Sequence, residues 1–252
     1  MPVFLSQLAP DLPKKMPTPP ENSFKACLAV ACLLVLVIYG IQLPQALDGQ
    51  LFSADSWAYF ELAKSFATDI YRFDTLRSFW SDTYSAAFPL GYPGLLHGLH
   101  SILGETPRAG ILINLLAALL TVPAAAMCAR GLGGSRWTGV AAALMLLLYR
   151  PYIEEIFAAR TIPLVILLDL MALTLLTGQR ISIGKALLAG LIAGLGSLIR
   201  FDHLILQALM AALVLWRTRR ILPVAGFAAG GLLGMLPWIE FSLIHFLSLI
   251  HI

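Results

Sequence analysis

The chain of 252 residues is 59% hydrophobic and 12% charged, with a mean hydropathy of +0.82 and a formal net charge of +3. Soluble domains carry about 25% charged residues, so this composition excludes an ordinary soluble domain and indicates an integral membrane protein. The small net charge is spread over many short segments and does not favour nucleic-acid binding. Three cysteines within apolar segments, Cys27, Cys32 and Cys128, provide neither a disulfide framework nor a metal-binding spacing.

The polar, proline-rich segment 1–23 is expected to be a cytoplasmic N-terminal tail. The apolar run 24–43 is too long for a signal-peptide core of about 7–15 residues, and it therefore predicts a first membrane helix. Further apolar segments predict helices at 109–129, 137–151, 161–177, 186–199, 203–216 and 221–239. The expected fold is all-α and membrane-integral, with about seven transmembrane helices.

The polar segment Arg200-Phe201-Asp202-His203 interrupts the apolar stretch 186–216 and decides the predicted topology. A single tilted span would bury these charges in mid-bilayer, at a cost of several kcal/mol. Two helices that meet at Arg200 would instead return the basic cluster 217–220 to the side of the N-terminus, as the excess of Lys and Arg in cytoplasmic loops requires. We therefore expect a hairpin, a cytoplasmic N-terminus and an acid-rich outer face.

The long connection 44–108 is expected to lie on that outer face and to contain interfacial helices anchored by aromatic residues. Asp55 stands near the start of its helix-forming stretch, SADSWAYFELAKSF. Two roles are open for Asp55, namely capping of the helix N-terminus or general-base chemistry. Tyr59, one turn later, would either orient Asp55 or a donor, or anchor the helix in the interface.

A second outer turn is predicted to hold Glu154 and Glu155 between Arg150 and Arg160. One of these carboxylates could bind an acceptor or, together with Asp55, a divalent cation, because hard cations favour carboxylate oxygens. The alternative is local pairing with the two arginines. Asp169 lies within a predicted helix, where we expect it to bond to Asn114 or to a threonine of a neighbouring helix.

A lipid phosphate at this face would need cationic partners, and Arg200 and Arg160 are the candidates, ahead of His203. The alternative role for these side chains is snorkelling to lipid headgroups.

Four stretches in this order resemble the N-terminal half of the GT-C glycosyltransferases, close to the protein mannosyltransferases and lipid A aminoarabinose transferases. The first is Asp55-Ser56-x-x-Tyr59, similar to the acidic motif of that family's first loop. The others are Pro89-x-Gly91-Tyr92-Pro93, Gly190-Leu191-x-x-Gly194-Leu195-x-x-Leu198-x-Arg200 and Pro237-Trp238. Phe201 stands where the family usually has a proline after the arginine, and the Arg-Asn expected after Pro237-Trp238 is absent.

The resemblance implies a GT-C-like module over 24–240, with 44–108 as its first periplasmic loop and 241–252 as a non-native or truncated end. It implies an inverting transferase in the bacterial inner membrane that moves a sugar from a polyprenyl-phosphate donor to a lipid, protein or polysaccharide acceptor on the periplasmic side. Asp55 would be the general base, Glu154 or Glu155 the second acid, and Arg200 a ligand of the donor phosphate, with Tyr59 and Tyr92 in support.

Two other readings of the sequence remain open. Another polyprenyl-lipid enzyme, such as an O-antigen ligase or polymerase, would usually carry its long outer loop later in the chain. A lipid or solute transporter would place polar residues at mid-depth on several helices, and here only Asp169 and Asn114 fit that description.

Overall fold

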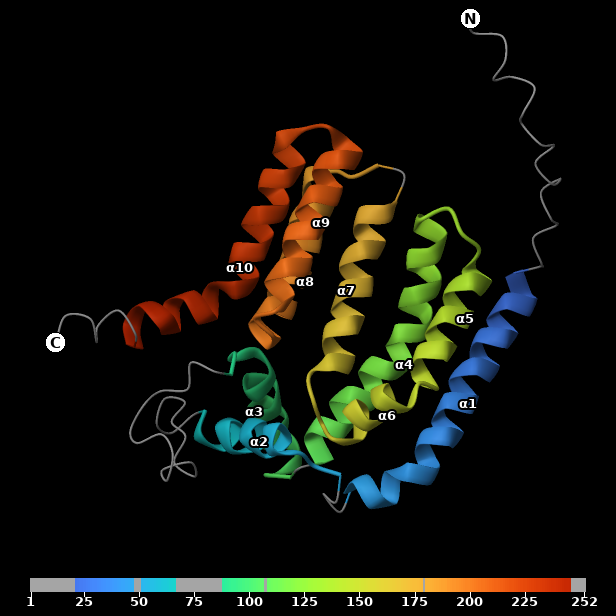
Figure 1. Cartoon of the computed structure of the whole chain (residues 1–252), viewed down its shortest axis with the longest axis vertical. Helices are drawn as coiled ribbons and strands as arrows, with labels where there is room; N and C mark the ends of the chain where they lie inside the picture. Colours follow the sequence, from blue (N-terminus) through green and yellow to red (C-terminus); the bar gives the residue numbers. More distant parts are fainter. Residues whose placement is uncertain (1–20, 48–50, 67–87, 107, 179, 246–252) are drawn as a thin grey trace, which may run out of the picture.

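The computed structural model describes residues 21–47, 51–66, 88–106, 108–178 and 180–245, and within these ranges the chain forms α-helices and no strand. The predicted all-helical fold is therefore confirmed for the described residues (Figure 1). The helices are α1 (Glu21–Leu47), α2 (Ala54–Ser65), α3 (Gly91–Leu103), α4 (Arg108–Gly131), α5 (Arg136–Leu147), α6 (Arg150–Phe157), α7 (Ile162–Thr177), α8 (Ile183–Ile199), α9 (His203–Thr218) and α10 (Ile221–His245).

Two of these helices, α4 and α10, are long and apolar enough to cross a membrane. A third span results if α6 and α7, which are bent by 109° relative to each other, are counted as one broken segment. The fold is thus consistent with a helical membrane protein. A helix forms at each of the seven predicted positions, whereas the number of spans, seven, stays a prediction.

The predicted helix 137–151 is wrong at its C-terminal end. The helix α5 ends at Leu147, and the separate helix α6 begins at Arg150 with Pro151 in its first turn. Proline is favoured there because its missing N–H would have no partner in the first turn of a helix. Glu154 and Glu155 consequently lie on a helix, and not in the loop that the sequence led us to expect.

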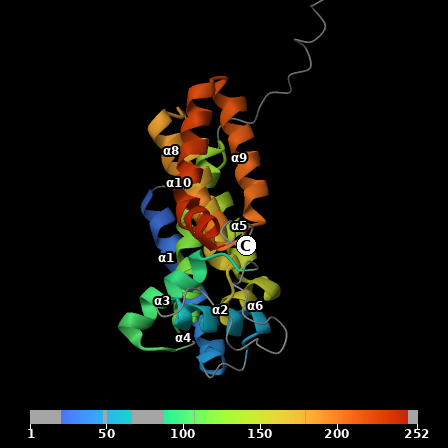
Figure 2. The same ribbon diagram turned by 90° about the vertical axis from the view of Figure 1, so that its left-hand side faces the viewer.

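The ends of the helices gather at two opposite ends of the molecule (Figures 1 and 2). The lower end consists of α2, α3, α6 and the connection between α8 and α9. The segment 44–108 thus contains helices, α2 and α3, whereas their position at a membrane interface stays a prediction. The upper end consists of the turns that join α4 to α5, α7 to α8 and α9 to α10. The predicted break at Arg200 is confirmed, because α8 ends at Ile199 and α9 begins at His203.

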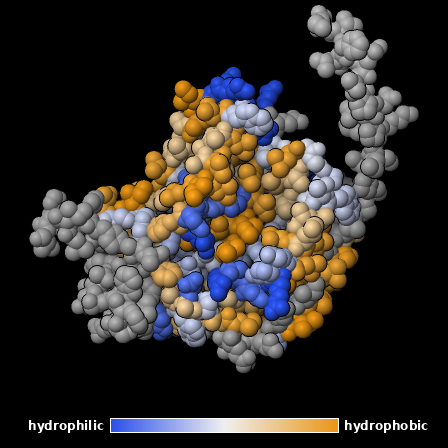
Figure 3. Space-filling model, in the orientation of Figure 1, coloured by the Kyte–Doolittle hydropathy of each residue, from blue (hydrophilic) through white to orange (hydrophobic). Residues whose placement is uncertain are grey.

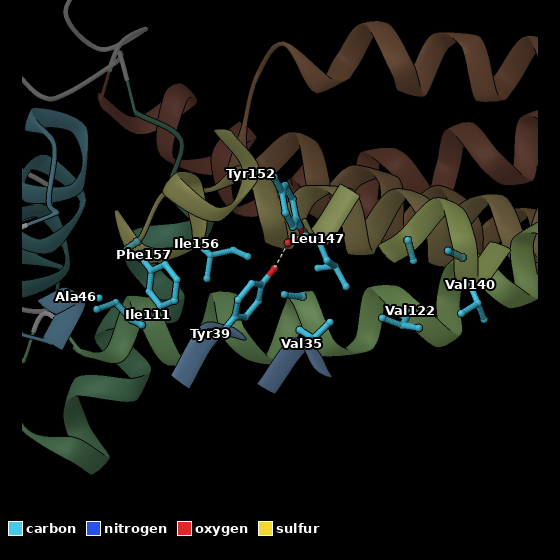
Figure 4. Packing of buried hydrophobic residues seen from close by; sticks show 14 of the residues in the cluster. Val35, Tyr39, Ala46, Ile111, Val122, Val140, Leu147, Tyr152, Ile156 and Phe157 are labelled. Atoms are coloured by element: carbon cyan, nitrogen blue, oxygen red, sulfur yellow. Dashed lines mark hydrogen bonds between the residues drawn. The ribbon is translucent and has the colours of Figure 1, made fainter. Parts of the chain in front are cut away.

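A hydrophobic cluster joins α1 to α4, α5 and α6 (Figure 4). The phenol of Tyr39 donates a hydrogen bond to the carbonyl oxygen of Leu147 at 3.0 Å. This bond satisfies one of the last carbonyls of α5, which lack a partner within their own helix. The ring of Tyr39 also packs edge-on against Phe157 of α6, with 5.7 Å between the ring centroids. The first helix is thereby held to the end of the bundle that carries α6.

Glycines bring α8 and α10 into backbone contact. A Cβ atom on Gly190 would lie 2.0 Å from the carbonyl oxygen of Phe227, and one on Gly194 would lie 2.3 Å from that of Gly231. On the opposite helix, a Cβ on Gly230 would lie 2.0 Å from the carbonyl oxygen of Leu187. Small residues four apart allow such close approach between helices in a membrane. The glycines of the Gly190–Arg200 motif therefore have a packing role.

We expect Gly194→Ala to lower the free energy of unfolding by about 1–3 kcal/mol, since its methyl group would force two backbones apart. Gly184→Ala is the matched control on the same helix, because nothing lies within 4 Å of the position of its Cβ. Denaturant titration of both variants in detergent micelles measures the difference. Equal stabilities of the two variants would contradict the close contact of α8 with α10.

Candidate functional site

Helix α2 begins with a capping box made by Ser53 and Ser56. The hydroxyl of Ser53 accepts a bond from the backbone N–H of Ser56 at 3.4 Å, and the backbone N–H of Ser53 donates to the hydroxyl of Ser56 at 3.1 Å. The alternative role of Asp55 as the cap is therefore wrong. Asp55 lies in the first turn, exposed, and its carboxylate forms no hydrogen bond or ion pair with any residue that the structure describes. The positive end of the helix dipole favours a carboxylate at this place.

The connection between α6 and α7 is held by three helices at once. Three successive carbonyl oxygens of this connection each accept a bond from a different helix, α2, α3 or α4. The pairs are the Ser56 hydroxyl with Ala158, the Tyr92 hydroxyl with Ala159 at 3.0 Å, and the Asn114 side-chain amide with Arg160 at 2.7 Å. Ala159 itself has a φ of +52°, a left-handed conformation that costs a non-glycine residue roughly 1–2 kcal/mol. The three bonds together fix this strained connection.

Arg160 joins the connection to the start of α2. Its Nε donates to the hydroxyl of Ser53 at 3.0 Å, and its Nη1 lies 2.5 Å from Oε1 of Glu155. Local pairing, one of the two alternatives for the glutamates, is thus confirmed. Glu154 pairs with Arg150 at 3.0 Å, and both of these side chains are largely exposed, at 62% and 89%. Glu155 is therefore linked through Arg160 to Ser53 at the start of α2, whereas Glu154 is not.

Arg200 lies at the C-terminal end of α8 and binds Asp202 in a two-pronged ion pair. The Nε and Nη2 atoms donate to the two carboxylate oxygens at 3.0 and 2.7 Å. These bonds hold the pKa of Asp202 below its usual range. The Nη1 atom of Arg200 lies 3.4 Å from the hydroxyl of Thr161, the residue that follows Arg160. Arg160 belongs to the α6–α7 connection, and Arg200 contacts the next residue of that connection, Thr161. The two arginines predicted to bind phosphate therefore lie at the same connection.

Tyr59 and Tyr92 fill the space between α2, α3 and this connection. Both rings are buried and meet edge to face with 5.2 Å between their centroids. Burial raises the pKa of the Tyr59 phenol above its usual range. A side-chain hydrogen bond with Thr161 and the Arg200 guanidinium oppose this rise in pKa, and the Asp55 carboxylate adds to it. The Tyr59 phenol thus lies within electrostatic reach of both Asp55 and Arg200. Tyr92 is fully buried and bonds to the connection, so its role is structural.

Several residues of this arrangement were not predicted. Asp169 was expected to bond to Asn114 or to a threonine of a neighbouring helix, but the Asn114 amide bonds instead to the carbonyls of Glu155, Ile156 and Arg160. That expectation for Asp169 is wrong, because Oδ1 of Asp169 lies 2.6 Å from Nε2 of His203, at ion-pair distance without the alignment of a hydrogen bond. The sequence signal for the bonds of Asn114 was the position of a polar amide in an apolar helix, because a buried amide must find hydrogen-bond partners.

The chemistry of this end of the molecule follows from its charges. Among the described residues no group of three His, Cys, Asp or Glu side chains is placed to hold a metal ion. The cluster contains the exposed, unpaired carboxylate of Asp55 on α2 and, on other elements of the same end, the guanidinium groups of Arg160 and Arg200, each of which binds a carboxylate. Figure 3 shows hydrophilic surface over α6 and over the lower ends of α8 and α9, surrounded by hydrophobic surface. Such a set can accept a proton at one point and bind an anion at the next.

The contact of α4 with the strained connection can be tested by a double-mutant cycle. A Cβ on Gly110 would lie 2.7 Å from the Cβ of Ala159 and 3.1 Å from the Tyr92 hydroxyl. Gly110→Ala should therefore lower the free energy of unfolding by about 1–3 kcal/mol. Ala159→Gly should restore a large part of this loss in the double variant, because it removes the opposing methyl group. Unfolding titrations in micelles measure the coupling, with Gly98→Ala, where the space is open, as control. Strictly additive effects would contradict the contact.

Comparison of the chain with protein-family models, curated proteins and solved structures finds no match. Membership of a family is therefore not shown, and the resemblance to the GT-C glycosyltransferases remains a prediction from four motifs. The contacts at the lower end of the molecule do not depend on this resemblance.

Proposed function

We propose that the protein is a membrane glycosyltransferase that uses a polyprenyl-phosphate-linked sugar as its donor. The acceptor is a hydroxyl group of a lipid, protein or polysaccharide on the periplasmic side of the bacterial inner membrane. Asp55 is the general base, and the lower end of the molecule is the active site. The observation that carries this proposal is the unpaired, exposed Asp55 carboxylate, two residues after the serine whose hydroxyl accepts a bond from Arg160.

The positions of the four motifs support the proposal. Tyr59 of the first motif and Tyr92 of the second are in ring contact, with 5.2 Å between their centroids. A Cβ on Gly91 of the second motif would lie 2.7 Å from the carbonyl oxygen of Leu198, which belongs to the third motif. Trp238 of the fourth motif packs against the ring of Phe201 at 4.7 Å. Segments that are far apart in the sequence thus gather at one end.

The proposed reaction needs one base and one anion-binding group. The acceptor oxygen forms a bond to the anomeric carbon of the sugar while its proton moves to the carboxylate of Asp55. The bond between that carbon and the phosphate oxygen breaks, and the lipid phosphate leaves with the electron pair. Attack opposite to the leaving group inverts the anomeric centre. A phosphate is a stable anion on departure, so no second acid has to protonate it.

Arg160 is better placed than Arg200 to bind the leaving phosphate. Arg200 uses three of its five N–H donors for Asp202 and Thr161, which leaves two. Arg160 uses one N–H for Ser53 and one for Glu155, which leaves three of its five donors without a partner among the described residues. The sequence favoured Arg200 over Arg160, and we propose the reverse order because Arg160 keeps more free donors. Arg200 then contributes its charge and the position of Thr161.

The transporter alternative requires polar side chains through the depth of the bundle. Between helices α7, α8 and α9, two described contacts join polar side chains, namely the pair of Asp169 with His203 and the bond from Ser197 to Gln207 at 3.0 Å. His203 begins α9 and Ser197 lies in the last turn of α8, so both contacts lie near Arg200. At the upper end, Arg217 of α9 donates to the backbone carbonyl of Leu176 in α7. These described contacts do not form a row of polar side chains through the depth of the bundle, which favours the enzyme.

Replacement of the base should abolish transfer without unfolding the protein. Asp55→Asn is expected to reduce kcat/KM by about 100-fold or more, since loss of a positioned base typically costs that factor. The measurement is transfer of radiolabelled sugar from a polyprenyl-phosphate donor in membranes. Glu61→Gln is the matched control on the same helix, where Glu61 pairs with Lys64. Full activity of Asp55→Asn would refute the proposed base.

A second pair of variants tests phosphate binding by Arg160. Arg160→Gln should reduce kcat/KM for the same donor by about tenfold or more, because a charge-assisted bond to the phosphate is lost. Arg150→Gln removes the same charge from the exposed partner pair of α6 and should change kcat/KM by less than about twofold. Equal effects of both substitutions would show that Arg160 has no special part in donor binding.

A further inference from the structure

The upper end of the molecule contains a cavity of about 660 Å³ lined by three arginines, Arg180, Arg217 and Arg220. It lies where the turn from α7 to α8 meets the turn from α9 to α10, at the far end from Asp55 (Figure 1). Figure 3 shows hydrophilic surface over this part of the α9–α10 turn. The side chains of Arg180 and Arg220 have no partner among the described residues. Guanidinium groups without counter-ions around a cavity favour an anionic ligand.

A second cavity of about 620 Å³ adjoins the first and contains Arg130, Arg136 and again Arg217. Arg217 is held in place between the two cavities, because it donates to the carbonyl oxygens of Leu176 at 2.6 Å and Gly178 at 3.2 Å. Those bonds satisfy carbonyl groups at the C-terminal end of α7, and they use two of the five N–H donors of Arg217. The remaining donors of a fixed guanidinium can bind an anion with little loss of side-chain entropy.

Two helix N-termini add to the positive potential of the first cavity. Its lining includes Ser182 and Ile183 at the start of α8, and Leu222 and Pro223 in the first turn of α10. The first N–H groups of a helix have no partner within it, and the helix dipole places partial positive charge there. Helices of 17 and 25 residues are long enough for the full effect. The two helix N-termini and the three arginines together give this cavity a positive electrostatic potential.

The charges around the cavities are of one sign. The sequences of the three upper turns, 131–135, 178–182 and 219–220, contain no Asp or Glu. An anion that enters would therefore meet cations and helix N-termini without opposing carboxylates from these turns. The lower end differs, because there both arginines already bind a carboxylate.

Exposed apolar side chains lie at and next to the lining of the first cavity. Leu222, which lines it, is 62% exposed, and the sequence neighbours of two of its lining arginines, Trp216 and Ile221, are 68% and 81% exposed. A soluble anion gains nothing from such side chains, whereas the acyl chains of a lipid would cover them. Basic pockets between helices at a membrane boundary are suited to phosphate-bearing lipid headgroups.

We propose that this cavity binds the phosphate headgroup of an anionic membrane phospholipid. Arg180 and Arg220 contact the phosphate, Arg217 orients it from the wall shared with the second cavity, and the acyl chains lie over Ile221 and Leu222. The site is independent of the proposed transferase activity, because it lies at the opposite end of the bundle. Its occupation would hold together the turns α7–α8 and α9–α10.

The test uses the purified full chain in a neutral detergent, titrated with phosphatidylglycerol or with phosphatidylcholine of the same acyl chains. Retained lipid is counted by native mass spectrometry, and stabilisation is followed as a rise in Tm. Phosphatidylglycerol should bind and raise the Tm, and phosphatidylcholine should not. Arg180→Gln combined with Arg220→Gln should weaken phosphatidylglycerol binding by about tenfold or more, since charge-assisted bonds are lost.

The matched control is Lys185→Gln combined with Arg219→Gln. It removes two positive charges from the start of α8 and from the α9–α10 turn, and neither residue lines the cavities. The Lys185 ammonium lies 3.5 Å from the backbone carbonyl of Arg180, so the single variant Arg219→Gln accompanies this control. The affinity of both control variants for phosphatidylglycerol should stay within about twofold of the wild type, because exposed charges outside the cavity are screened. An equal loss in both double variants would overturn the site in favour of general surface charge. If the first double variant does not fold, Arg220→Gln alone serves in its place.

Inorganic phosphate separates a lipid from a soluble ligand. At millimolar concentration it should displace little phosphatidylglycerol and leave the Tm unchanged, because it lacks the acyl chains that cover the exposed apolar side chains. A rise in Tm equal to that given by phosphatidylglycerol would identify the cavity as a site for soluble phosphate and overturn the lipid proposal. Equal binding of phosphatidylcholine would overturn the proposed recognition of net negative charge.

Discussion

The lower end of the molecule depends on the connection between α6 and α7, whose successive carbonyl oxygens at 158, 159 and 160 accept bonds from α2, α3 and α4. A buried carbonyl without a partner costs about 1–3 kcal/mol, so each donor is worth more here than at an exposed surface. The donors also bring together elements that are distant in sequence. Without this connection, Arg160 would not be held against Ser53 at the start of α2.

The same connection converts a local strain into a functional geometry. Ala159 in a left-handed conformation reverses the chain within two residues, so that Arg160 points back to Ser53 and Thr161 meets Arg200. Such strained residues persist only where the surroundings over-determine them, and they often mark functional sites. In this protein the side chain of Arg160 reaches Ser53, that of Arg200 reaches Thr161, and Asp55 is exposed in the first turn of α2. Under the proposed function, this arrangement would supply a proton acceptor and an anion-binding group at the same end of the molecule.

The sequence predicted the helices well because hydrophobic runs and breaks are local signals. The hairpin at Arg200 followed from the cost of burying charge, and the separation of α5 from α6 was missed although Pro151 marked it. The site was only partly predictable. Asp55, Glu155 and Arg160 were identified by residue type, but the bonds of Asn114 span more than 40 residues and depend on how α4 packs. A left-handed alanine such as Ala159 leaves no sequence signal, because the surrounding bonds impose its conformation.

The two ends of the molecule apply the same residue type to different tasks. At the lower end Arg160 and Arg200 are each tied to a carboxylate, and the carboxylate of Asp55 has no partner among the described residues. At the upper end Arg180 and Arg220 line a cavity and bind no described carboxylate, and two helix N-termini increase the positive potential. Burial of paired charge is tolerable within an apolar fold, whereas unpaired cations are stable only where water or an anionic partner reaches them. The two ends therefore differ in how their arginines are neutralised, by carboxylates of the chain at the lower end and by water or an external anion at the upper end.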